Sequence, residues 1–306
     1  EAEGDTFAGF EHILGSAFDD TLKGDGNSNT FDGGAGDDTI NTGAGDDLIL
    51  GNIGFDTLNG GAGAGDILSY ENLDGRLSFI GFFGGTQVEK RLNGPPPENE
   101  DDPDPNQQFD QIAGFETIRG TAFNDFLGGG GTGITLEGGL GDDIFRSAIT
   151  YGNDIYLGQE GNDMLQVEIS NGQQISGSFD GGSDTDLLDG FVSGDDLEIN
   201  MGAGTLTNGN GVITFTNVEN IDGGGGDDTL FGDGNANTIG GGFGNDAIFG
   251  RGGADTLNGE AGNDTIEGGG GIFLSAGEGS YASVFRSEDV IYAMRSRNGE
   301  QSLVGQ

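Results

Sequence analysis

The chain has 306 residues, of which 53 are acidic and 10 are basic, so its formal net charge is −43. A charge this negative argues against nucleic acid or an anionic membrane as a partner, and it favours cations. Cysteine is absent, which excludes disulfides, and no apolar run approaches the roughly 18 residues that span a bilayer. The 67 glycines and the high charge are together typical of a disordered chain, unless these residues prove to be periodic.

The glycines and aspartates are periodic, with a period of nine residues. Successive units read GGAGDDTIN, TGAGDDLIL and GNIGFDTLN from Gly33, and GGGGDDTLF, GDGNANTIG, GGFGNDAIF, GRGGADTLN and GEAGNDTIE from Gly223. Glycine prevails at positions 1, 2 and 4, aspartate at position 6 and a large apolar residue at position 8. Such a short fixed period is typical of solenoids, in which every unit is one supersecondary element.

Position 6 supplies the candidate metal ligands. If each unit forms a short strand and a turn, two units make one coil, and parallel coils stack about 4.8 Å apart. Carboxylates eighteen residues apart then lie one above another, which is repulsive unless a cation lies between them. Calcium suits such a site because it accepts roughly six to eight oxygen ligands, including backbone carbonyls, whereas zinc and copper prefer nitrogen and sulfur. The predicted ligands are Asp20, Asp38, Asp47, Asp56, Asp66, Asp125, Asp143, Asp154, Asp163, Asp186, Asp228, Asp246, Asp255 and Asp264.

Position 8 supplies the predicted core. It is occupied by Leu22, Phe31, Ile40, Ile49, Leu58, Leu68, Leu127, Leu136, Phe145, Tyr156, Leu165, Leu188, Leu230, Ile239, Ile248, Leu257 and Ile266. One apolar side chain in nine residues makes a thin core for a chain that must order so much glycine. We therefore expect bound ions to provide the stability that the interior does not.

These units resemble the RTX (haemolysin-type calcium-binding) nonapeptide repeats, over roughly two thirds of the chain. The resemblance implies an all-β fold, a parallel β-roll solenoid of three RTX arrays joined by β-rich connectors, with a short non-repeat C-terminal tail. It implies Ca²⁺ between successive turns, held by the position-6 aspartates and turn carbonyls, with roughly ten ions in all. It also implies bacterial type I secretion and folding outside the cell, where calcium is abundant.

Three modules follow one another along the chain. We predict repeat modules at 7–70, at 109–190 (irregular) and at 215–275, connectors at 71–108 and 191–214, and a non-repeat tail at 276–306. An apolar strand containing Glu11, Glu116 or Glu219 introduces each array, and these glutamates are 105 and 103 residues apart. The connectors contain the β-prone segments Leu77-Ser-Phe-Ile and Leu197-Glu-Ile-Asn.

The repeat pattern has departures that affect the predicted sites. The second unit of each array lacks its aspartate and has Asn29, Ile134 or Asn237 at position 6. Asparagine can still offer one neutral oxygen, whereas isoleucine offers none, so the Ile134 position is expected to be poor in metal. Irregular spacing leaves open how three aspartates of the middle array pair, namely Asp154, Asp163 and Asp186.

The first connector and the C-terminus depart from the pattern most. The segment 95–105 contains all five prolines among acidic residues, which is typical of an exposed loop or spacer and leaves a further calcium site possible. After Gly271, Ile272-Phe273-Leu274 replaces the aspartate turn, so the roll is expected to end there. The tail beyond it reads either as a short helix beginning at Ser287 or as a strand at Val290-Ile291-Tyr292. It is predicted to be a secretion signal or a docking surface.

Function is predicted to be non-enzymatic. The single histidine, His12, cannot form a zinc-protease motif and is expected to be a surface strand residue. We expect an extracellular or cell-surface bacterial building block of a surface layer, sheath, filament or adhesin, whose partners are calcium ions and either itself or matrix components. The alternative is the C-terminal folding and secretion region of an exoenzyme or toxin whose catalytic domain is absent. A calcium buffer is a third reading. The initial residues, Glu1-Ala2-Glu3, predict a processed chain or a piece of a longer one.

Overall fold

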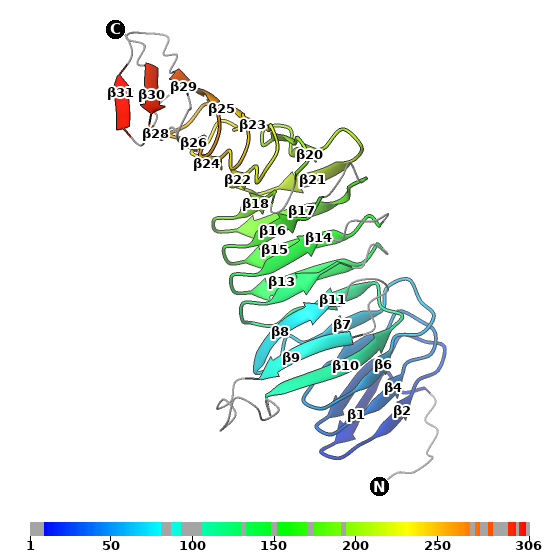
Figure 1. The fold of residues 1–306 in the computed structure, drawn as a ribbon. Helices are drawn as coiled ribbons and strands as arrows, with labels where there is room; N and C mark the ends of the chain where they lie inside the picture. The colour runs from blue at the N-terminus through cyan, green and yellow to red at the C-terminus, as the bar shows by residue number, and fades with distance from the viewer. Residues whose placement is uncertain are drawn as a thin grey trace. The chain divides into compact units, whose positions relative to one another are not determined.

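A computed structural model describes most of the chain. The described residues are 9–80, 87–92, 106–129, 133–147, 152–169, 174–190, 194–269, 273–275, 281–283, 293–297 and 300–303. Every regular element among them is a β-strand, so this part of the chain contains no helix that could cross a membrane (Figure 1). The chain divides into two compact units, Glu1–Phe145 with Gly152–Gly161, and Arg146–Tyr151 with Asn162–Gln306.

The first unit is built from parallel strands, most of which follow the previous strand of their row after eighteen to twenty residues. One row consists of β1 (His12–Ser16), β3 (Thr30–Gly34), β5 (Leu48–Leu50), β7 (Ile67–Ser69), β11 (Thr117–Arg119), β13 (Thr135–Leu140) and β15 (Ile155–Glu160). The opposite row begins with β2 (Thr21–Lys23), β4 (Thr39–Asn41) and β6 (Thr57–Asn59). Position-8 residues pair in register, Ile13 with Phe31 and Leu22 with Ile40. The prediction of a parallel β-roll is confirmed.

The second unit repeats this design. One row consists of β16 (Met164–Val167), β18 (Leu187–Asp189), β22 (Asn220–Asp222), β24 (Thr238–Gly240), β26 (Thr256–Asn258) and β28 (Phe273–Ser275). The other row contains β17 (Ser176–Ser183), β23 (Thr229–Phe231), β25 (Ala247–Arg251), β27 (Thr265–Gly269) and β29 (Tyr281–Ser283). The parallel pairing within each row again joins position 8 to position 8, as in Leu230 with Ile248.

The repeat residues explain this geometry. The position-8 side chains form the core: Phe31, Ile49 and Leu68, for example, are completely buried between the two rows. Glycine at positions 2 and 4 permits the turn, because Gly34 and Gly36 have φ values of +92° and +123°, which residues with a side chain rarely adopt. Three-residue strands that alternate with such turns cannot bury an apolar face alone, so they stack on their neighbours.

A three-stranded antiparallel meander interrupts the repeats in each unit. In the first unit it consists of β8 (Gly75–Ile80), β9 (Gln87–Leu92) and β10 (Gln107–Ala113), which lie side by side (Figure 1). The second unit contains β19 (Glu198–Asn200), β20 (Thr205–Thr207) and β21 (Val212–Thr216). β10 continues the row of β6 in parallel, and β21 pairs with β17 in the same way. The predicted connector segments thus form strands, whereas the proline-rich segment lies outside the described residues.

The C-terminal part corrects one expectation. We expected the roll to end after Gly271, but β28 pairs with β26 and β29 pairs with β27, both in parallel register. The reason is that backbone hydrogen bonds form the ladder without an aspartate turn, and they place Leu274 in register opposite Leu257. β30 (Ala293–Arg297) and β31 (Glu300–Leu303) then add two antiparallel strands. The possible helix start at Ser287 lies outside the described residues.

Two further strands, β12 (Phe126–Gly128) and β14 (Ile144–Ser147), follow the first meander. β14 spans the boundary between the two units in the sequence. The residue before each of them is a predicted ligand, Asp125 or Asp143. The same relation holds along both rows, where the position-6 residue is the last residue before each repeat strand.

Candidate metal centres

The predicted ligands are gathered in the turns and are buried. Thirteen of the fourteen aspartates are buried, with exposed fractions of 4% or less, and Asp20 in the first coil is half-buried. Carboxylates seldom lose contact with water to this extent unless they are paired or bound to a metal. Their burial is therefore the first observation that calls for a counter-charge.

Backbone amides arrange these aspartates in ladders. The Oδ1 atom of Asp38 accepts a hydrogen bond of 2.8 Å from the amide of Asp20, and the amide of Asp38 donates one of 2.9 Å to Oδ1 of Asp56. The same bond joins Asp228 to Asp246 (2.8 Å) and Asp246 to Asp264 (3.0 Å). We call this arrangement the inner ladder. Each carboxylate is thereby fixed one coil above or below the next.

All the predicted ligands belong to inner ladders. In the first unit these run Asp20–Asp38–Asp56–Asp110, Asn29–Asp47–Asp66–Glu116, Leu77–Asp125–Asp143 and Ile134–Asp154. In the second unit they run Asp163–Asp186–Glu219, Asn237–Asp255 and Leu197–Asp228–Asp246–Asp264. The pairing in the middle array, which the sequence left open, places Asp154 above Ile134 and joins Asp163 to Asp186.

The second carboxylate oxygen of many of these aspartates is the feature that fits a metal, whereas the Oδ2 atoms of Asp20 and Asp125 accept hydrogen bonds from the Ser16 and Thr121 amides (2.7 Å each). The buried Oδ2 atoms that accept no hydrogen bond from the protein include those of Asp47, Asp66, Asp186, Asp228, Asp246 and Asp255. A buried charged oxygen without a partner is costly. A hard divalent cation coordinated by oxygen would remove that cost.

Glycine at position 1 leaves room for these oxygens. A Cβ atom on Gly223 would lie 2.5 Å from Oδ2 of Asp228 and 2.6 Å from the carbonyl oxygen of Gly241. One carboxylate oxygen and one carbonyl oxygen of the next coil therefore converge on the bare face of the glycine. A side chain on Gly223 would displace the carboxylate, which explains why glycine prevails at position 1. The exception is Thr42 in the turn of Asp47, where the hydroxyl donates a hydrogen bond to the Gly60 carbonyl.

The donor set selects calcium. Among the described residues no three His, Cys, Asp or Glu side chains converge on one point, so a site of side chains alone is absent from this part of the chain. A site formed by two stacked carboxylates and turn carbonyls contains oxygen only, which is the set that Ca²⁺ prefers. When bound, the ion would supply the positive charge that holds successive carboxylates together.

Burial and mutual repulsion raise the pKa values of several of these carboxyls. Burial raises the pKa of Asp186 to about 7, and repulsion by Asp163 and Glu219 adds to this shift. A hydrogen bond from the Asp163 amide lowers the same pKa in part. Burial likewise raises the pKa of Asp228 to about 7 and that of Asp246 to about 6. These shifts describe carboxylates that hold their charge with difficulty until a cation is supplied.

A pH dependence follows from these shifts. Between about pH 4 and pH 7 the ion-free fold binds more protons than the unfolded chain, so its stability decreases as pH rises. In chelator we therefore expect more residual β-structure at pH 5 than at pH 8, because the protonated carboxyls no longer repel one another. Circular dichroism of the calcium-free chain at these two pH values measures it. Less β-structure at pH 5 than at pH 8 would contradict the assignment.

An outer ladder runs beside the inner one in the opposite direction. The amide of Asp37 donates to Oδ1 of Asp19 (2.9 Å), and Oδ1 of Asp37 accepts from the amide of Phe55 (3.0 Å). Asn245 and Asn263 continue such a ladder above Asp227. These position-5 side chains are exposed, so they order the turn from outside without needing a counter-ion.

Three other acidic residues of the inner ladders were not predicted from the sequence. Oδ1 of Asp110 accepts from the amide of Asp56 (3.0 Å), and Oε2 atoms of Glu116 and Glu219 accept from the amides of Asp66 and Asp186 (2.9 Å each). An acidic residue two positions before a buried apolar residue, as in Asp110-Gln-Ile112 and Glu116-Thr-Ile118, was the available signal. This signal is hard to recognise because the glycines of the repeat are missing around Asp110 and Glu116.

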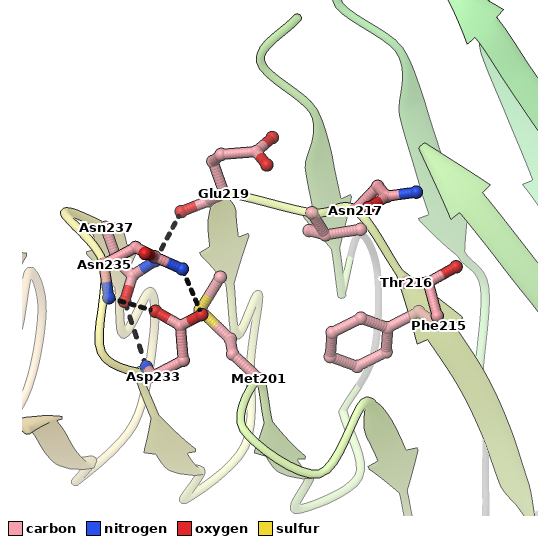
Figure 2. Close-up of a pocket in the computed structure, with 9 residues that line it drawn as sticks. Met201, Phe215, Thr216, Asn217, Glu219, Asp233, Asn235 and Asn237 are labelled. Atoms are coloured by element: carbon pink, nitrogen blue, oxygen red, sulfur yellow. Dashed lines mark hydrogen bonds between the residues drawn. The ribbon is translucent and has the colours of Figure 1, made fainter. Parts of the chain in front are cut away.

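The asparagines at position 6 close their turns with an amide group. Figure 2 shows Asn237 beside Glu219. Both residues line a hollow of about 180 Å³. The Nδ2 atom of Asn237 donates to the Glu219 carbonyl (3.1 Å), and its Oδ1 atom accepts from the Asp233 amide (3.1 Å). Asn29 likewise donates to the carbonyl of Phe10 (3.0 Å). A neutral donor thus points at a carbonyl that could otherwise face a cation. Ile134 contributes no side-chain oxygen, and its amide donates to Oδ1 of Asp154 (3.0 Å).

Comparisons with known proteins agree with this geometry. The family model of the RTX calcium-binding nonapeptide repeat matches residues 5–40, 41–67, 150–166, 215–248 and 240–272. No curated protein sequence matches the chain. A solved structure, the extracellular lipase LipA from Serratia marcescens, is 19% identical with a TM-score of 0.22, over 70% of this chain and 38% of the lipase, which is too distant to inform fold or activity. The nonapeptide matches and the parallel roll with aspartate turns show that the chain carries RTX calcium-binding nonapeptide repeats.

Proposed function

We propose that this chain is a secreted calcium-binding structural protein of a bacterium, which folds when it binds Ca²⁺ outside the cell. It serves as a building block of a surface layer, sheath, filament or adhesin. The observation that carries this proposal is the set of buried Oδ2 atoms without a hydrogen-bond donor, one above another in the turns. Ions at these positions convert a stack of repelling carboxylates into the main source of stability.

The distribution of acids supports a role without catalysis. Among the described residues every buried carboxylate belongs to an inner ladder. Acid and base chemistry on a substrate needs carboxylates that converge in a cleft. Here the buried carboxylates are separated by one coil each and are engaged by backbone amides.

Removal of calcium provides the test. In chelator we expect the far-UV signal of β-structure to be largely lost and the sedimentation coefficient to fall, and both should recover when Ca²⁺ is added back. Half-saturation is expected on the order of 10⁻⁴–10⁻³ M, as for extracellular modules. Sodium chloride at matched ionic strength is the control for charge screening, and Mg²⁺ is the control for size, because it demands tighter octahedral coordination. A chain that remains compact and β-rich after thorough chelation would refute the proposal.

The first coil supports assembly of copies. β1 pairs with β3, and within the described residues no strand pairs with its other edge. Leu14 and Phe18 of this coil are 75% and 77% exposed. Free strand edges with apolar side chains favour association with another strand. Electron microscopy with calcium at high protein concentration should show ordered assemblies, and monodisperse monomers would count against a scaffold role.

A further inference from the structure

One inner-ladder position in the first unit holds a cation that belongs to the protein. Lys90 lies in β9 of the meander and is completely buried. Its Nζ atom is 2.6 Å from Oδ1 of Asp110, 3.2 Å from Oδ2 of Asp56 and 2.6 Å from the backbone oxygen of Asn52. Asp56 and Asp110 are successive members of one inner ladder, and Asn52 is at position 2 of the turn that ends in Asp56.

These three oxygens are of the kinds that Ca²⁺ would use elsewhere in the roll: two stacked carboxylates and a turn carbonyl. The neighbourhood is also altered to suit an ammonium group. The ring of Tyr70 covers Gly51, the position-1 glycine of this turn, where a Cβ atom would collide with the ring. The Tyr70 hydroxyl donates a hydrogen bond of 2.6 Å to Oδ2 of Asp110. The carboxylate oxygens are thus provided with donors from the protein.

The contrast with the turn of Asp246 is direct. Oδ2 of Asp246 is buried and accepts no hydrogen bond from the protein, whereas Oδ2 of Asp56 faces the Lys90 ammonium. The ion pair is shielded from water, because the exposed fraction of the side chain is 0% for Lys90 and 5% for Asp56. Burial of an ammonium is tolerated only where such charge-assisted partners surround it.

We propose that the Lys90 ammonium occupies the place of a calcium ion between Asp56 and Asp110, so that this position of the roll excludes metal and closes without it. This inference rests on the proposed function, in which the ordinary positions take Ca²⁺. It gives the first meander a defined role. β9 carries the counter-charge into the roll and fastens the meander to the first array, in addition to the backbone pairing of β10 with β6.

The count of bound ions tests the inference. Lys90→Met retains the apolar stem and removes the charge, and Lys23→Met is the matched control because Lys23 is exposed on β2 and the substitution changes the net charge equally. Native mass spectrometry and equilibrium dialysis of the full chain with saturating Ca²⁺ give the stoichiometry. Lys90→Met should bind one more ion than the wild type and should need a higher calcium concentration to fold, whereas Lys23→Met should match the wild type.

Lys90→Gln is a second variant, in case methionine disturbs the packing around residue 90. It should bind the same additional ion. An unchanged or smaller ion count in both Lys90 variants, with the control unchanged, would overturn the inference. Acetylation of the wild-type chain separates this failure from that of the proposed function, since Lys23 and Lys90 are its only lysines. In the folded chain Lys23 should react and Lys90 should not. If the wild type bound no calcium but Lys90 remained unreactive, the proposed function would fail and the burial of Lys90 would stand. Equal reactivity of the two lysines would overturn the assignment of Lys90.

Discussion

Replacement of Asp246 by alanine should loosen the third array on both sides of the substituted turn. Asp246 is shared by two neighbouring positions of an inner ladder: its Oδ1 atom accepts from the Asp228 amide (2.8 Å), and its own amide donates to Asp264 (3.0 Å). Alanine leaves the buried Asp228 amide without an acceptor, which costs about 1–3 kcal/mol. The loss of the Asp246 Oδ2 atom as a calcium ligand adds to this, so the calcium concentration at the folding midpoint should rise markedly.

Two other variants separate the contributions of charge and hydrogen bond. Asp246→Asn retains an oxygen for the Asp228 amide but removes the negative charge, so it should weaken calcium binding with a smaller loss of stability than alanine. Glu267→Gln is the charge-matched control, because Glu267 is exposed on β27 of the same array. Calorimetric titration with Ca²⁺ and urea unfolding at fixed calcium measure both effects. If Glu267→Gln lowered calcium affinity as much as Asp246→Asn, general charge and not the inner ladder would govern binding.

Gly241→Ala should damage the same site without the removal of any ligand. Gly241 is at position 1, and a Cβ atom there would collide with Oδ2 of Asp246 and lie 2.9 Å from the carbonyl oxygen of Gly259. The carboxylate must then move away from the place where a cation would be held. Overpacking of this kind costs about 1–3 kcal/mol, and weaker calcium binding should accompany it.

Gly234→Ala is the matched control in the same array. Nothing lies within 4 Å of a Cβ atom on Gly234, and its backbone is not in the positive-φ region. Alanine should therefore be tolerated there within about 0.5 kcal/mol, or should stabilise slightly by restricting the unfolded chain. Urea unfolding with and without calcium compares the two. Equal tolerance of both alanines would mean that the position-1 glycines do not make room for the carboxylates.

Most of the inner ladders could be predicted because the pattern is local. A nine-residue period with a turn and a three-residue strand fixes the partner of each residue eighteen positions away, as in Asp20 and Asp38. The pattern fails wherever the chain leaves the roll. The partner of Asp56 is 54 residues away in Asp110, and that of Asp66 is 50 residues away in Glu116. No spacing rule identifies such pairs, because the meander between them has no repeat.

Lys90 illustrates the same limit. In Val88-Glu89-Lys90-Arg91 the alternation of a strand places Val88 and Lys90 on one face, which the sequence alone would assign to half-exposed packing. Only the return of β10 to the row of β6 brings Asp110 beside Asp56 and gives the buried ammonium its partners. The outer ladder through Asp37 was equally invisible, since exposed acidic residues usually have no specific partner.

By itself the sequence determined the period, the turn glycines, the stacked aspartates and the apolar row, because each depends on contacts that recur at one short spacing. The tertiary structure alone decided which turns are completed by the protein's own groups: Lys90 between Asp56 and Asp110, and the amide of Asn237 on the Glu219 carbonyl. The physical reason is that the charge balance of a turn depends on which cations and hydrogen-bond donors the fold brings to it from distant segments. A nine-residue period contains no information about those segments.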